Sequence, residues 1–171
     1  MVTTIVIPQD AIGEPHVQEL AGLDDFQKVT GGFLEPFEVA PLGITFWVNE
    51  AAARERGGLN ARATALYWYY NAGHGLPNFM LGDVVVSGNG SCRSGGDVPE
   101  ELVFGLVAPH RFVVQVSPDD DEHWQNTFAR FDYIYDATLW CMLLARSFEH
   151  GPAFRVQAEA PSGTEALLEE D

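Results

Sequence analysis

Short runs of alternating or β-branched apolar residues recur along most of the chain, which is the pattern of strands. Between these runs, apolar residues at helical spacing predict short helices, one of which begins at Asn60 as its N-terminal cap. Together they predict an α+β fold with a mainly antiparallel sheet. The predicted strands are residues 2–8, 16–20, 33–39, 43–50, 80–88, 111–116 and 154–160.

Two glycines stand in the segment VTGGFLEPFEV, residues 29–39. Gly31 follows a helical pattern and supplies the left-handed residue that ends a helix. Pro36 interrupts the following strand, and a residue without an N–H group favours an edge position in the sheet. A phosphate-binding loop has the opposite order, a strand followed by glycines and a helix, so we interpret these glycines as structural.

A single long helix is predicted for about residues 118–148, lying across one face of the sheet. Ser117 is its expected cap and Pro118 its first residue, and acidic side chains in a first helical turn complement the helix dipole. Aromatic and aliphatic residues then continue at helical spacing, so this helix is expected to form the spine of the core. A shorter helix is expected from Asp97, with Glu100 completing a capping box.

Length and composition favour one domain, since 171 residues with 46% hydrophobic side chains suffice for a single core. Residues 106–160 form a strand–helix–strand extension of it, and residues 161–171 an acidic tail. The chain shows no basic leader and no apolar run near 18 residues, which predicts a cytoplasmic protein without a membrane anchor. Cys92 and Cys141 lie in unrelated contexts, which favours free thiols.

Charge is the most unusual property, with 25 acidic and 9 basic side chains and a net charge of −16. Residues 97–171 hold 15 acidic and 4 basic groups, and therefore most of the excess. Such a field repels nucleic acid and anionic membranes and attracts basic surfaces. Solubility, a high-salt habitat or coding bias would explain the same excess, and the sequence leaves these causes open.

Several segments resemble one known family: VTGGFLEPFEV, FWVNE, GLNARAT, MLGDVVVSG and DVPEEL. Over about residues 2–105 they are similar to the small phage and plasmid family called domain of unknown function 3846. The chain departs from the family pattern at Thr30, which separates the valine from the glycines, and in GLNARA, which lacks a proline. The resemblance implies an accessory protein of a mobile element in a bacterial cytoplasm, and it brings no catalytic residue with it.

The first functional hypothesis is a non-enzymatic protein that binds and modulates a host protein with a basic surface. This class includes counter-defence proteins and mimics of DNA, and it is motivated by the charge and the phage-like resemblance. It predicts no direct contact with nucleic acid or membrane, while exposed edge strands leave a homo-oligomer open. The candidate binding residues are Asp119, Asp120, Asp121, Glu122, Asp132 and Asp136.

A second hypothesis is a protein that binds and sequesters a nucleotide, because aromatic side chains stack on bases. It depends on arginines converging beside the aromatic cluster. An uncharacterised enzyme is a third alternative, for which the sequence assigns no catalytic residue, metal or cofactor. The residues of the candidate nucleotide pocket are Trp47, Arg62, Tyr67, Trp68 and Tyr70.

Overall fold

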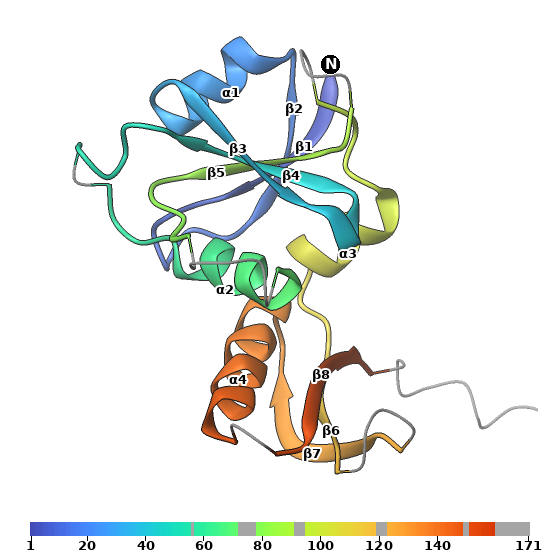
Figure 1. Ribbon diagram of the computed structural model, residues 1–171. Coiled ribbons are helices and arrows are strands. Elements are labelled where there is room, and N and C mark those ends of the chain that lie inside the picture. Colours follow the sequence, from blue (N-terminus) through green and yellow to red (C-terminus); the bar gives the residue numbers. More distant parts are fainter. Residues whose placement is uncertain (56, 72–77, 91–94, 119–122, 149–150, 160–171) are drawn as a thin grey trace, which may run out of the picture.

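The computed structural model describes residues 1–55, 57–71, 78–90, 95–118, 123–148 and 151–159. It contains a five-stranded sheet in the order β2-β1-β5-β4-β3 and a three-stranded sheet in the order β7-β6-β8 (Figure 1). All strand pairs in both sheets are antiparallel, which confirms the α+β class. No helix in the described ranges is both long and apolar enough to cross a membrane. The elements are β1 (Val2–Ile7), β2 (His16–Leu20), α1 (Leu23–Thr30), β3 (Leu34–Val39), β4 (Ile44–Asn49), α2 (Ala61–Tyr70), β5 (Val84–Gly88), α3 (Glu100–Val107), β6 (Phe112–Ser117), β7 (Gln125–Phe131), α4 (Ile134–Ser147) and β8 (Ala153–Ala158).

Both faces of the five-stranded sheet are covered. On one face Phe26 of α1 packs with Trp47 and Val85, and on the other Leu66 of α2 packs with Phe46 and its neighbours. The central strand β5 is therefore buried from both sides, as its uninterrupted valines predict. The three-stranded sheet lies beyond α2 and α3, on the side away from α1 (Figure 1).

The predictions for residues 29–39 are confirmed. Gly31 ends α1 in the left-handed region at φ 82°, and its N–H donates to the Gln27 carbonyl. A Cβ atom on Gly32 would lie 2.4 Å from Oδ1 of Asn49, so a larger residue would displace the Asn49 amide from its bonds to Ala51 and Glu55. Pro36 lies in β3, the edge strand next to β4. The segment is a helix stop followed by an edge strand.

The predicted helix over residues 118–148 is wrong in its first half. Ser117 is the last, fully buried residue of β6 and not a cap, and residues 125–131 form strand β7 paired with β6. Phe128 matched the helical spacing but is 92% exposed, so its place in that pattern did not reflect burial. Pairing with β6 decides the local structure here, and α4 begins only at Ile134. This helix covers the three-stranded sheet.

The capping box predicted at Asp97 and Glu100 is also wrong. Helix α3 begins at Glu100 after Pro99, without a side-chain cap. The Asp97 carboxylate instead accepts a hydrogen bond of 2.7 Å from the backbone N–H of Thr3. This bond extends the contact between the start of α3 and the edge of β1, so a tertiary contact has replaced the local one.

Asn60 caps α2 as predicted, and it does more. Its side-chain oxygen accepts from the N–H of Ala63, and its Nδ2 donates to the carbonyls of Ile7 and Gly82 at 2.9 and 3.0 Å. The residue is 1% exposed, so all these groups are shielded from water. Asn60 thereby joins the end of β1, the loop before β5 and the first turn of α2.

Helix α2 also holds the two sheets together. The backbone N–H of Val156 in β8 donates to the Tyr69 hydroxyl at 2.8 Å. In the adjacent contact, the Tyr135 hydroxyl of α4 donates to the Leu106 carbonyl of α3 at 2.9 Å. Hydrogen bonds and apolar packing therefore join the smaller sheet and its helix to the larger one.

Replacing Asn60 tests this junction. Asn60→Ala removes the cap and the hydrogen bonds to the Ile7 and Gly82 carbonyls, the first of them buried, so we expect it to lower the free energy of unfolding by about 2 to 4 kcal/mol. Asn60→Ser keeps a capping hydroxyl but reaches neither carbonyl, and its loss should fall between alanine and wild type. Urea unfolding measures both, with exposed Asn78→Ala as a near-neutral control. A serine variant as stable as wild type would mean that the two carbonyl bonds contribute nothing.

The Tyr69 contact predicts a dependence on alkaline pH. Burial raises the pKa of Tyr69 to about 12, above the value of about 10 in an unfolded chain. A raised pKa gives stability that is present below pH 10 and lost as the pH rises toward 12, with about 1 kcal/mol lost by pH 11. Tyr69→Phe lacks this loss and the hydrogen bond, so the stability gap between it and wild type should narrow from pH 8 to pH 11. Urea unfolding at the two pH values measures the gap, and a constant gap would contradict the assignment.

Candidate binding site

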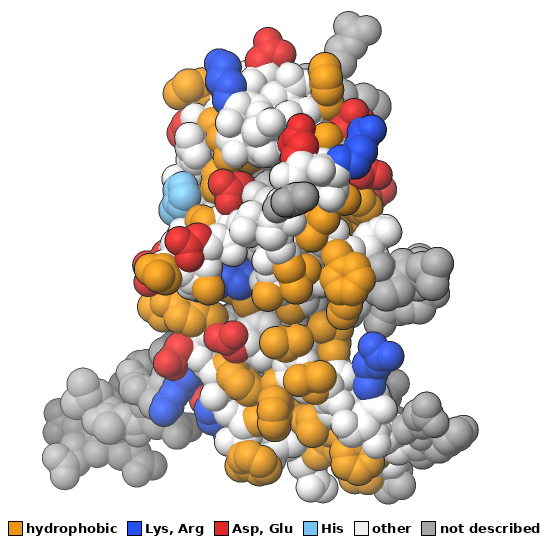
Figure 2. Space-filling view, turned by 90° about the vertical axis from the view of Figure 1, so that its left-hand side faces the viewer, with side chains coloured by type: hydrophobic (Ala, Val, Ile, Leu, Met, Phe, Trp, Pro, Cys, Tyr) orange, Lys and Arg blue, Asp and Glu red, His pale blue; other side chains and the backbone are white. Residues whose placement is uncertain are grey.

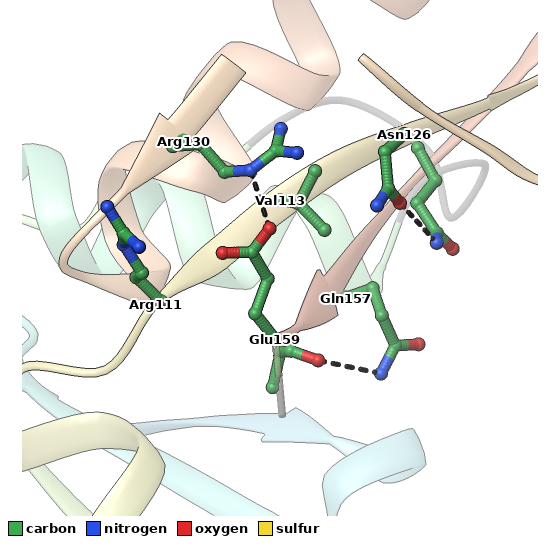
Figure 3. A pocket seen from close by; sticks show the side chains of 8 residues that line it. Arg111, Val113, Asn126, Arg130, Gln157 and Glu159 are labelled. Atoms are coloured by element: carbon green, nitrogen blue, oxygen red, sulfur yellow. Dashed lines mark hydrogen bonds and ion pairs between the residues drawn. The ribbon is translucent and has the colours of Figure 1, made fainter. Parts of the chain in front are cut away.

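The three-stranded sheet has one covered and one open face. Val114, Ala129 and Cys141 form a buried cluster between the sheet and α4. The neighbouring positions point to the opposite face, which carries polar side chains around a shallow hollow of about 500 Å³. The hollow is lined by Arg111, Val113, Gln115, Asn126, Arg130, Gln157, Ala158 and Glu159 (Figure 3).

Basic side chains gather on this open face. Arg111, Arg130 and Arg155 are three of the nine basic residues of a chain whose net charge is −16. Arg130 forms an ion pair with Glu159 at 2.5 Å, and Figure 3 shows the Glu159 carboxylate turned toward Arg130. No described carboxylate pairs with the Arg111 guanidinium, so the face keeps a local positive charge.

Arg155 lies beside the hollow in a fixed position. Its Nε donates to Oε1 of Gln115 at 2.8 Å, and its guanidinium carbon lies 4.2 Å from the centre of the Trp124 ring. Stacking on tryptophan and bonding to an amide hold the planar group in one orientation. The remaining donors of Arg155 are thereby placed at the sheet surface before any ligand arrives.

Amide side chains complete the face. Gln115 of β6 donates to the side-chain oxygen of Asn126 in β7 at 2.8 Å, across the strand pair. Amides and guanidinium groups together offer donors to a carboxylate or phosphate and acceptors to an N–H group. The chemistry of this surface is therefore that of recognition by hydrogen bonds and charge.

A bulge in β7 carries an exposed aromatic residue between Asn126 and Arg130, two residues that line the hollow. Val113 pairs with Arg130 and Gln115 with Asn126, so residues 127–129 lie opposite the single Val114. The Thr127 hydroxyl donates to the Val114 carbonyl at 2.7 Å and anchors the bulge. Phe128 at its centre is 92% exposed. Bulges of this kind redirect side chains and recur next to functional sites.

The predicted acidic surface is only partly described. Asp119, Asp120, Asp121 and Glu122 lie outside the described residues. Asp132 and Asp136 are both exposed, the first just before α4 and the second in its first turn. Negative charge near the start of a helix complements its dipole, so their position also has a structural explanation.

The predicted aromatic pocket is not assembled in the described structure. Trp47 packs on α1, on the opposite sheet face from Tyr67 and Tyr70. Arg62 donates to the carbonyls of Gly13 and Ala11, which fixes the loop between β1 and β2. Trp68 donates to the Asn78 carbonyl at 2.7 Å and contacts Phe79. The hydrogen bonds and packing of these residues stabilise the fold. The arginines that lie close together are Arg111, Arg130 and Arg155.

The sequence contains a signal for the open face that the predictions missed. Arg111, Val113 and Gln115 alternate along a predicted strand, and so do Arg155 and Gln157, so each set shares one face. The prediction did not pair these two strands, so it did not place the two sets of side chains on the same sheet face. Arg130 was missed because its segment matched a helical pattern.

The thiol and metal chemistry of the described residues is limited. Burial raises the pKa of the Cys141 thiol to about 11, so this cysteine is unreactive at neutral pH. No group of three or more histidine, cysteine, aspartate or glutamate side chains in the described ranges is placed to hold a metal ion. Cys92 lies outside those ranges.

Comparison with family models, with curated proteins and with solved structures finds no match to this chain. The resemblance of residues 2–105 to domain of unknown function 3846 therefore stays a prediction. The open face of the three-stranded sheet, with its arginines and amides, is the surface of the described residues best suited to binding.

Proposed function

We propose that this chain is a non-enzymatic accessory protein that binds another protein through the open face of the three-stranded sheet. The observation that carries the proposal is the gathering of Arg111, Arg130 and Arg155 on one polar sheet face. Following the family resemblance, we place the protein in a bacterial cytoplasm, as the product of a phage or mobile element that acts on a host protein.

The occupant that suits this face is an acidic segment. Arg111 has no acidic partner among the described residues, and bidentate hydrogen bonds from arginine match the geometry of carboxylates. The rest of the chain is strongly acidic and repels an anionic segment elsewhere, so charge would guide such a segment to this one face.

Phe128 supplies the apolar part of the proposed interface. Aromatic residues and arginine contribute most of the binding energy in protein interfaces, especially where they lie close together. Phe128 is held out by an anchored bulge, and Trp124 stacks on Arg155 close by. A partner that covers Phe128 would also exclude water from the neighbouring ion pairs, which strengthens them.

The net charge of the chain, −16, predicts a different partner, one with a basic surface. Of the acidic residues that would bind it, Asp132 and Asp136 are described and are exposed. The two proposals use different surfaces and are separable by mutation. A counter-defence or DNA-mimic role belongs to this second surface.

Nucleotide binding is a second candidate, now at the open face. A hollow of about 500 Å³ falls in the range of small-molecule sites, and Arg111 with Arg130 would meet phosphate groups. The hollow is shallow and polar, however, and buries little apolar surface of a ligand. For this reason we place protein binding first.

The test is capture from a bacterial lysate with wild type and matched variants. Arg111→Gln combined with Phe128→Ala should lower recovery of the specific partner at least about tenfold, because it removes a charged and an aromatic contact. Arg54→Gln combined with Phe33→Ala makes the same chemical changes at exposed positions of the larger sheet unit and should leave recovery unchanged. Quantitative mass spectrometry compares the retained proteins.

Equal recovery by the two double variants would contradict the proposal. Calorimetric titration with ATP and with inorganic phosphate addresses the second candidate: binding that Arg111→Gln abolishes would favour the nucleotide reading. Loss of capture on reversing Asp132 and Asp136, with the open-face variant unaffected, would favour the partner with a basic surface.

A further inference from the structure

The outer face of α4 is apolar, and no other described element packs on it. Its inner face packs on the three-stranded sheet, whereas Leu139, Trp140 and Leu143 on the outer face are 43%, 38% and 51% exposed. Figure 2, which faces the left-hand side of Figure 1, shows hydrophobic side chains gathered over the lower part of the molecule, where α4 lies. Leu139 and Leu143 lie one turn apart with Trp140 beside them, and the three form a stripe suited to a second helix.

Opposite charges flank this stripe at equal distances. Asp136 lies three residues before Leu139, and Arg146 lies three residues after Leu143. Both charged residues are exposed, and neither forms an ion pair with another described residue. The outer face is therefore arranged symmetrically about residue 141: Leu139 corresponds to Leu143, and Asp136 corresponds to Arg146, which carries the opposite charge.

We propose that α4 pairs antiparallel with α4 of a second copy of this chain, around a two-fold axis level with residue 141. In that register Leu139 of each copy faces Leu143 of the other, and Asp136 faces Arg146 at both ends. At 1.5 Å per residue, each charge lies about 7.5 Å from the axis along the helix, so both pairs form at once. Packing near 20° from antiparallel keeps the ends of the helices together.

The charges select this occupant. A two-fold interface brings the same patch of each copy together, so the patch must complement itself, and an acidic end with a basic end does so in the antiparallel arrangement. A parallel pair would place like charges together at both ends. A membrane surface favours helices with several basic flanking residues, whereas this one has an aspartate in a strongly acidic chain.

Trp140 fits the centre of such an interface. It lies against Phe131 of β7, with ring centres 6.4 Å apart, and is held there while part of its ring stays exposed. Partly exposed tryptophan flanked by leucine is typical of the energetic centre of an interface. The open arginine face lies on the other side of the three-stranded sheet and stays accessible in the dimer.

Sedimentation velocity of the full chain tests the proposal, independently of any partner at the open face. Wild type should sediment as a dimer at about 200 µM, and Leu139→Glu combined with Leu143→Glu as a monomer. Asp136→Arg and Arg146→Asp should each raise the dissociation constant about tenfold, because each replaces two attractive pairs by two repulsive ones. The double charge swap restores both pairs and should return to within about threefold of wild type.

Arg54→Asp is the control for a charge reversal elsewhere, and thermal unfolding shows whether each variant is folded. Wild type that remains monomeric at about 200 µM overturns the proposal. A dimer that the single swaps leave unchanged, or that the double swap fails to restore, overturns the antiparallel two-fold register.

Discussion

The structure depends on the burial of α2 against both sheets. Leu66 fills the core of the five-stranded sheet, and Tyr69 bonds the backbone of β8 in the three-stranded sheet, so one helix serves two layers. Asn60 fixes where this helix begins by bonding β1 and the loop before β5 from a position shielded from water. Because the first turn is held there, the last turn brings Tyr69 against Val156, in the middle of β8. The buried amide of Asn60 and the hydroxyl of Tyr69 therefore help to place the smaller sheet, together with the Tyr135 bond to α3 and the apolar packing.

The same arrangement explains why the smaller sheet has an open face. Its apolar positions are taken up by α4 and Tyr69 on one side, so only polar and charged side chains remain for the other. Val113 and Ala158 are the apolar residues of the lining, and the long side chains around Val113 shield it to 1% exposure. The bulge at residues 127–129 interrupts the regular pairing and leaves Phe128 exposed between Asn126 and Arg130. An exposed phenylalanine on an anchored bulge contributes nothing visible to the core, which is why we connect it with binding.

Local signals in the sequence were sufficient to predict the structure at positions where the tertiary contacts agree with them. Gly31 and Asn60 were predicted because a helix stop and a cap have local causes, and Pro36 because its missing N–H excludes a central strand. The prediction failed where pairing with another strand decides the structure, here the preceding strand β6. Residues 125–131 have apolar spacing compatible with a helix, but β6 offers hydrogen bonds that no local pattern reveals. The same gap concealed the open face, since Arg111 precedes β6 while Arg130 and Arg155 lie in β7 and β8, and the sequence does not state how these strands pair.

Dimerisation through α4 and recognition through the open face would reinforce each other. The two surfaces lie on opposite sides of the three-stranded sheet, so a dimer presents two binding faces. A partner with two acidic segments, or one that is itself two-fold symmetric, could then engage both faces at once. The second contact forms at a high effective concentration, so a modest affinity per face gives strong overall binding. A shallow hollow suits such an arrangement, because two linked weak sites can replace a single deep one.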